Sequence, residues 1–187
     1  MNHYPSVPHL IQIVLSLNNL AVALRARFGK TGSMTDLEEA ILVHRESLSL
    51  RPTLHPDRSQ SLNNRAVALR TRFGETGSMT DLEEAISMHC ESLSLRPTPH
   101  PDRSQSLNNL ALALWDRFGE TGSMTDLEEA ISMLRESLSL HPAPHPGRPW
   151  VLTDLARALE TRWKTSGIQS DLSEATSLRQ EALAMSS

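Results

Sequence analysis

The amino-acid sequence predicts an all-α protein, a solenoid in which helical hairpins stack into an α-α superhelix. The first observation is a repeat, because the dipeptide Asp-Leu recurs every 45 residues, at Asp36, Asp81, Asp126 and Asp171. The second is that each copy contains two stretches with apolar residues at helical spacing. The third is that glycine or proline separates these stretches. Since a single hairpin cannot bury its apolar face alone, we expect four stacked hairpins, about eight helices, in one solenoid domain, 1–187.

The repeats are expected at approximately 10–54, 55–99, 100–144 and 145–187. The second and third copies differ at only eight positions, which recent duplication by itself explains. The first copy departs from them before Leu17, and the fourth departs nearly throughout. Features kept in all four copies are therefore the best indicators of what the fold requires.

The second copy shows how the first helix of each hairpin is specified. Pro56 fits the first turn of a helix, and Asp57 lies near the positive end of the helix dipole. Gly74 and Gly77 indicate the end of the helix, because glycine readily adopts the left-handed conformation found there. Between these signals runs an apolar stripe formed by Leu62, Ala66, Leu69 and Phe73.

The second helix of the hairpin has its own start and stop signals. A capping box is predicted either from Thr80 with Glu83 or from Asp81 with Glu84. Pro97 prevents the helix from continuing. The apolar stripe between them consists of Leu82, Ala85, Ile86, His89 and Leu93.

Composition excludes several classes of function. The net charge of −4 gives no basis for binding nucleic acid, which requires lysine and arginine to neutralise phosphates. A single cysteine, Cys90, rules out an internal disulfide and a multi-thiolate metal site. No run approaches the roughly 18 apolar residues that cross a bilayer, and the N-terminus has no signal-peptide pattern. We expect a cytoplasmic protein that does not bind membranes.

Three segments, in this order along the chain, resemble the tetratricopeptide repeat: Leu62-Asn63-Asn64-x-Ala66, Asp81-Leu82-Glu83-Glu84-Ala85 and Leu93-x-Leu95-x-Pro97. The run LNNLA preceded by His-Pro is most similar to the kinesin-light-chain type, as in fungal proteins with many such repeats. The spacing from Ala66 to Ala85 is longer than in the usual repeat, which implies an extended first helix. The resemblance implies a superhelix whose first helices line a concave groove.

The first asparagine of each recurring pair is a candidate for binding a peptide. A helical wheel places Asn18 on one stripe with Val22 and Arg25, and the resemblance assigns that stripe to the groove. A side-chain amide can satisfy both the N–H and the C=O of an extended peptide, as the asparagines of kinesin light chains do for cargo. The candidate peptide-binding residues are Asn18, Asn63, Asn108, Gln60, Gln105, Val22, Val67, Leu112, Arg25, Arg70 and Trp115.

Each of these assignments has a structural alternative. The first asparagines could simply be solvated, while Asn19, Asn64 and Asn109 join neighbouring helices through amide hydrogen bonds. Trp115 is either a binding hot spot or a side chain folded over its own solenoid. Arg65 occupies a position where the other copies have leucine, so we predict that Arg65→Leu raises the melting temperature.

No residue pattern indicates catalysis, a metal or a cofactor. His55, His100 and His145 are whole repeats apart and cannot easily converge on a metal. His44 and His89 lie on the core stripe, where satisfied packing histidines are expected. The sequence therefore predicts a non-catalytic scaffold that binds a protein or an extended peptide in the groove. The alternative is an assembly or regulatory segment of a larger protein, acting through end-to-end self-association, which the apolar run LIQIVL at 10–15 favours.

Overall fold

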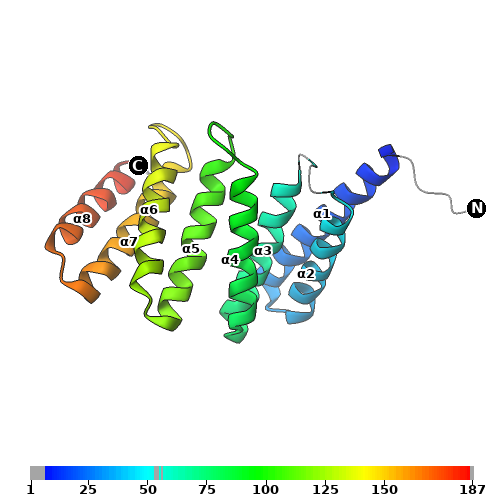
Figure 1. Ribbon diagram of the computed structural model, residues 1–187, viewed down its shortest axis with the longest axis horizontal. Helices are drawn as coiled ribbons and strands as arrows, with labels where there is room; N and C mark the ends of the chain where they lie inside the picture. The colour runs from blue at the N-terminus through cyan, green and yellow to red at the C-terminus, as the bar shows by residue number, and fades with distance from the viewer. Residues whose placement is uncertain (1–6, 53–54, 56, 186–187) are drawn as a thin grey trace, which may run out of the picture. The chain divides into compact units, whose positions relative to one another are not determined.

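The computed structural model describes residues 7–52, 55 and 57–185, and side chains from residue 11 onward. Within these residues the chain forms eight α-helices and no strand, which confirms the predicted all-α class (Figure 1). The helices are α1 (Val7–Thr31), α2 (Met34–Ser49), α3 (Arg58–Thr76), α4 (Met79–Ser94), α5 (Arg103–Thr121), α6 (Met124–Ser139), α7 (Arg148–Ser166) and α8 (Gln169–Ala184).

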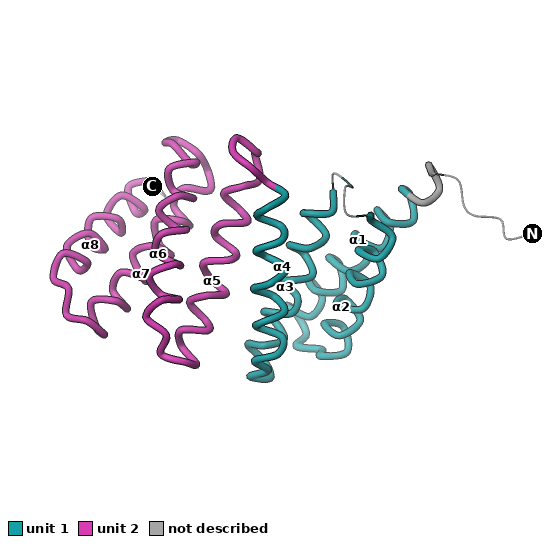
Figure 2. Tube along the Cα trace, in the orientation of Figure 1, with its two compact units in different colours: residues 1–95 teal, residues 96–187 magenta. Residues whose placement is uncertain are grey.

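The helices pair into hairpins, and the hairpins group into two compact units, Met1–Leu95 and Arg96–Ser187 (Figure 2). In the first unit, hairpin α1–α2 packs on α3–α4 mainly through α2 and α3. In the second unit, hairpin α5–α6 packs on α7–α8 mainly through α6 and α7. Each unit is thus two stacked hairpins, the local arrangement that a solenoid requires. A single domain over 1–187 stays a prediction.

The second helix of each hairpin begins earlier than the predicted capping boxes. In α4 the N-cap residue is Ser78, whose hydroxyl accepts a hydrogen bond from the backbone N–H of Asp81 at 3.4 Å. Thr80 and Asp81 therefore lie inside the helix, and the capping boxes predicted for them are wrong. Asp57 precedes α3 without a side-chain capping bond, and Pro56 lies outside the described residues.

Glycine ends the first helix of each hairpin as predicted, but only one of the two proposed glycines acts in this way. Gly77 follows the last residue of α3 with φ +69°, and its N–H donates to the Phe73 carbonyl at 2.7 Å. A side chain at this φ would be strained, which is why glycine is suited to the position. Gly74 lies inside α3, so its assignment as a stop was wrong.

The predicted apolar stripes form the core. In α3 the four stripe residues from Leu62 to Phe73 are buried, and in α4 the residues Leu82, Ala85, Ile86 and His89 are buried as well. The central apolar cluster of the first unit joins residues of α1, α2, α3 and α4: Phe28, Leu37, Ile41, Ala66, Ala68, Leu69 and Ala85. The predominance of alanine and leucine lets the helices approach closely, which fits a chain with few aromatic residues.

An arginine-aspartate pair joins the two helices of every hairpin. Arg72 of α3 donates two hydrogen bonds to the carboxylate of Asp81 in α4, at 2.7 and 2.6 Å. The same bidentate arrangement recurs in Arg27–Asp36, Arg117–Asp126 and Arg162–Asp171. This pair was not predicted from the sequence, although an arginine precedes each repeated aspartate by nine residues. The repeated Asp-Leu dipeptide therefore marks the start of a helix and also this arginine–aspartate pair, which we call the hairpin clamp.

The Arg65→Leu variant should melt about 2–4 °C higher than the wild type, the shift that about 1 kcal/mol produces in a chain of this size. The equivalent Leu110 and Leu155 are 2% and 1% exposed, so leucine fits this face of the helix. Arg65 Nε is buried without a hydrogen-bond partner. The variant loses the ion pair with Glu84, but Glu84 is 41% exposed and such pairs contribute little.

Thermal unfolding followed by circular dichroism measures this effect. Arg65→Ala is the control, because it removes the charge and also the packing of the arginine stem, and it should melt below Arg65→Leu. A melting temperature for Arg65→Leu at or below that of the wild type would contradict the assigned helix face.

Candidate functional site

The predicted binding stripe in the first unit runs along α1 and α3. On α1, Asn18 and Arg25 are half-buried and Val22 is 39% exposed. On α3, Val67 and Arg70 are half-buried. The stripe is therefore neither an open polar surface nor a sealed core, and Val22 is its most accessible apolar side chain in this unit.

A chain of amide hydrogen bonds connects the two first helices of this unit. Asn64 Nδ2 of α3 donates to Asn18 Oδ1 of α1 at 2.9 Å. Gln60 Nε2 donates in turn to Asn64 Oδ1 at 2.9 Å. The structural role predicted for the second asparagine is thus confirmed at Asn64. The oxygen of Asn18 already serves this packing, and the peptide contact of Asn18 stays a prediction.

The other two first asparagines lie deeper than a solvated ladder would place them. Asn63 is 2% exposed. Asn108 is half-buried, and its Oδ1 is buried with no hydrogen-bond partner. A peptide would reach Asn63 only after neighbouring side chains moved, so its predicted contact needs a rearrangement. The oxygen of Asn108 remains an acceptor that a ligand N–H could satisfy.

In the second unit, the stripe on α5 carries Gln105, Leu112 and Trp115. Gln105 is exposed, while Leu112 and Trp115 are half-buried. The guanidinium of Arg157 in α7 lies over the Trp115 ring, 4.8 Å from its centroid. This cation-π contact covers part of the indole. The observed arrangement matches the alternative prediction, a tryptophan that packs on its own solenoid.

Arg25 stands out among the arginines of the first unit. No carboxylate among the described residues pairs with it, and burial lowers the pKa of its guanidinium from the usual value. Beside it, His44 of α2 is fully buried and neither ring nitrogen has a hydrogen-bond partner. Burial, with the nearby charges of Arg25 and Arg65, lowers the pKa of His44 to about 4. Arg65 is paired with Glu84, so Arg25 is the charge beside His44 that no carboxylate among the described residues pairs with.

His89 repeats this environment in α4. It is 0% exposed with both ring nitrogens unpartnered, and burial together with Arg70 lowers its pKa to about 3. The prediction that these histidines pack in the core is confirmed for both. The expectation that their nitrogens would be satisfied is wrong, because none of the four ring nitrogens has a hydrogen-bond partner among the described residues. Neutral imidazole tolerates this site far better than imidazolium does.

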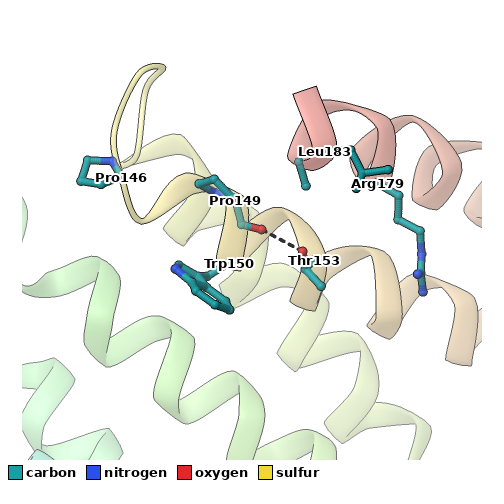
Figure 3. Close-up of a pocket in the computed structure, with 7 residues that line it drawn as sticks. Pro146, Pro149, Trp150, Thr153, Arg179 and Leu183 are labelled. Carbon is teal, nitrogen blue, oxygen red and sulfur yellow. Dashed lines mark hydrogen bonds between the residues drawn. The ribbon is translucent and has the colours of Figure 1, made fainter. Parts of the chain in front are cut away.

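The most exposed large apolar side chain of the described residues is one that the binding prediction did not include. Trp150 of α7 is 76% exposed. It lines a pocket of about 470 Å³ together with residues of α8 and the link before α7 (Figure 3). The lining residues are Pro146, Pro149, Trp150, Thr153, Arg179, Ala182 and Leu183. The sequence signal was the change from Gln60 and Gln105 to tryptophan at the corresponding position.

The described residues contain no group of three or more histidine, cysteine, aspartate or glutamate side chains that could hold a metal ion. Within them, no helix combines the length and apolar character needed to cross a membrane.

A sequence model of the tetratricopeptide repeat matches residues 14–57, 58–102 and 103–147, which is more than half of the chain. The chain belongs to the tetratricopeptide repeat family. The matched tetratricopeptide repeats begin three to four residues after the predicted boundaries, and α7–α8 adds a fourth hairpin of the same plan. Among curated proteins, no sequence matches this chain.

Solved structures of other repeat proteins are similar in fold to this tetratricopeptide repeat chain. Two are crystal structures of nearly identical TPR-like repeats from a Podosopora anserina protein described as a kinesin light chain. Their TM-scores are 0.62 and 0.61, and their sequence identities to this chain are 21% and 19%. These alignments cover 92% and 90% of this chain and 74% and 75% of the other chains. A de novo designed helical repeat protein aligns with a TM-score of 0.52 and 22% identity, covering 95% of this chain and 94% of its own. At these identities the likeness shows the fold.

Proposed function

We propose that this chain is a non-catalytic scaffold that binds an extended segment of a partner protein along the first helices of its hairpins. Membership of the tetratricopeptide repeat family supports a role in protein interaction. The fold similarity to the Podosopora anserina kinesin light chain repeats is consistent with this proposal. A cytoplasmic location suits a chain whose single cysteine forms no internal disulfide.

The observation that carries the proposal is the unpaired guanidinium of Arg25 beside the exposed side chain of Val22. Arg25 lies three residues after Val22 and seven after Asn18, so all three face the same side of α1. A half-buried guanidinium without a carboxylate is a ready donor for a ligand carboxylate, and such charge-assisted bonds are strong. The surface therefore suits a peptide that presents an acidic side chain next to an apolar one.

A random peptide library displayed on phage, selected on the immobilised chain, tests this proposal. Selected peptides should be enriched in aspartate or glutamate adjacent to an apolar residue. Arg25→Gln should raise the Kd of a selected synthetic peptide at least tenfold, which corresponds to about 1.4 kcal/mol. Because the contact is charged, the affinity of the wild type should also fall as salt increases.

Arg45→Gln is the matched control, because Arg45 is an exposed arginine on the neighbouring helix α2. It should leave the Kd unchanged. The double variant Asn63→Ala with Asn108→Ala tests separately whether these asparagines contribute to peptide affinity, provided that it melts like the wild type. Peptides that bind Arg25→Gln as tightly as the wild type would refute the carboxylate contact, and a library yielding no binder would refute the peptide-binding function.

The alternative function indicated by the sequence, self-association through the ends of the repeat array, also has a specific observation in its favour. Trp150 and Leu183, which are 76% and 70% exposed, lie together in one pocket at the face formed by α7 and α8. Exposed apolar side chains that cluster in this way are typical of interaction sites.

A further inference from the structure

We propose that two copies of this chain associate head to tail, with the exposed side of α1 from one copy docking on the α7–α8 face of the other. This inference is independent of peptide binding along the first helices. It rests on the equivalence of positions between repeats, which shows what occupies the same face inside each unit.

The α7–α8 face contains a pocket of about 470 Å³ bordered by Trp150 and Leu183 (Figure 3). Figure 3 shows Pro149, Trp150 and Thr153 on α7, and Arg179 and Leu183 on the neighbouring helix α8. Among the described residues, no helix covers this side of α8. The pocket therefore has the apolar lining and the accessibility of a docking surface.

The same face of the first hairpin is covered. Arg179, Ala182 and Leu183 have equivalent positions in that hairpin, three repeats earlier. These positions are occupied by His44, Ser47 and Leu48, which are 0%, 1% and 9% exposed. Helix α3, the first helix of the next hairpin, packs there on α2. The counterpart of the pocket, beside Ile11, Val14 and Leu15, is reduced to about 220 Å³ and is lined in part by the link to α3. The natural occupant of this face is thus a first helix.

Helix α1 carries the matching face in exposed form. The same face of α7 packs on α6 and includes Leu155 and Ala158, which are 1% and 0% exposed. On α1 the equivalent Leu20 is 46% exposed and Ala23 is also exposed. The side of α1 with Leu20 also borders an open pocket, lined by Gln12, Ile13, Ser16, Leu17 and Leu20. The chain therefore displays both halves of its own repeat-to-repeat contact.

The polar groups are in register for this docking. Inside the first unit, Asn64 donates to Asn18 across the contact between α1 and α3. In the proposed contact the equivalent donor is Asn19 of one copy, and the equivalent acceptor is Thr153 of the other. The Thr153 hydroxyl donates to the Pro149 carbonyl at 2.9 Å, which leaves its oxygen able to accept. The direct counterpart of the Asn64–Asn18 bond can therefore form between copies.

Two substitutions make this contact weaker than the contacts inside the chain. Thr176 replaces the isoleucine of the other copies, Ile41, Ile86 and Ile131. Arg179, paired with Glu160 at 2.7 Å, replaces the buried His44 and Leu134. The association should therefore depend on concentration. Because the two faces differ, the contact does not close on itself, and further copies add in the same direction.

Sedimentation velocity of the whole chain from about 10 μM to about 1 mM tests the proposal. The weight-average sedimentation coefficient of the wild type should rise with concentration. Leu20→Asp on α1 and Trp150→Asp on α7 should each raise the Kd at least tenfold, the change produced by about 1.4 kcal/mol. Both side chains are exposed, so both variants should melt like the wild type. Leu42→Asp, at a 52% exposed position of α2 outside both faces, should associate like the wild type.

Mixing the two variants identifies the geometry. Leu20→Asp retains an intact α7–α8 face, and Trp150→Asp retains an intact α1 face. At a concentration where each variant alone is monomeric, an equimolar mixture should therefore form a 1:1 dimer and nothing larger. A wild type that is monomeric at about 1 mM, an association that survives either substitution, or a mixture that fails to form the dimer would overturn the proposal.

Discussion

The free energy of unfolding should fall as the pH is lowered from about 6.5 towards about 4, because two fully buried histidines resist protonation. His44 and His89 have pKa values lowered to about 4 and about 3 by burial and by nearby arginines. A difference of one pKa unit between the folded and unfolded states corresponds to about 1.4 kcal/mol. His44 by itself should therefore reduce the stability by about 3 kcal/mol, a large part of the total for an ordinary domain.

The direction of this effect follows from the state that binds the proton. Above the ordinary histidine pKa of about 6.5, the imidazoles are neutral in both states and stability does not change with pH. Below it, the unfolded chain takes up protons while the folded chain does not, so unfolding is favoured. The loss levels off once the pH falls below the folded pKa values. The stability contributed by Asp36 and Asp171, whose pKa values are lowered by hydrogen bonds to arginine, is lost mainly below their ordinary pKa of 3.8, so the measurements between pH 6.5 and 4 report chiefly on the histidines.

Urea denaturation at several pH values between 7 and 4 measures the effect. The double variant His44→Leu with His89→Leu should lose most of the slope and should be more stable at pH 7, because it removes four buried ring nitrogens that have no hydrogen-bond partner. Leucine fits, since Leu134 occupies this position in the third copy and is fully buried.

His100→Asn, in the link before α5, is the control for this experiment. Its amide oxygen can still accept the bond that Asp102 N–H donates to His100 Nδ1. This variant should retain the slope. If the double leucine variant kept the full loss of stability between pH 6.5 and 4, the buried histidines would not be its cause.

Breaking the hairpin clamp from the arginine side should produce a second large effect. Arg162→Leu should reduce the free energy of unfolding by about 3 kcal/mol, because it leaves the carboxylate of Asp171 buried without its cation. The side chain of Asp171 is 3% exposed, and Arg162 donates to its two oxygens at 2.7 and 2.8 Å. This hydrogen bonding lowers the pKa of Asp171, so the stability it contributes is present above the ordinary aspartate pKa and is lost as the pH falls.

A double-mutant cycle in urea separates the pair from its parts. Adding Asp171→Asn to Arg162→Leu should recover part of the loss, because no buried charge then remains unpaired. Arg135→Leu is the comparison, since Arg135 and Glu174 form an exposed pair, 48% and 39% accessible, and its loss should cost at most about 1 kcal/mol. A cycle in which the two clamp substitutions simply add would show that the pair contributes no coupling energy.

The helices and their buried stripes could be predicted from local spacing, since an apolar residue every three or four positions defines one helical face whatever packs against it. The N-caps were misplaced because Ser78, Thr80 and Asp81 are all good capping residues. What decided between them is that Arg72, on another helix, binds the Asp81 carboxylate. The prediction for the histidines was likewise correct only in part. The apolar stripe places His44 in the core, but it does not reveal that Arg25 and Arg65 are its neighbours.

The 45-residue period, the two helices in each copy and the glycine after each first helix follow from the sequence, because they depend on residues within one helix or one turn. Which side chains remain available to a partner is settled only by packing between helices. Asn18 and Asn64 are 46 residues apart, and the Arg157 that lies over Trp115 comes from another helix. Leu20 and Leu155 occupy the same repeat position, yet one is 46% exposed and the other 1%. Exposure is a property of the neighbouring helix, which no local pattern encodes.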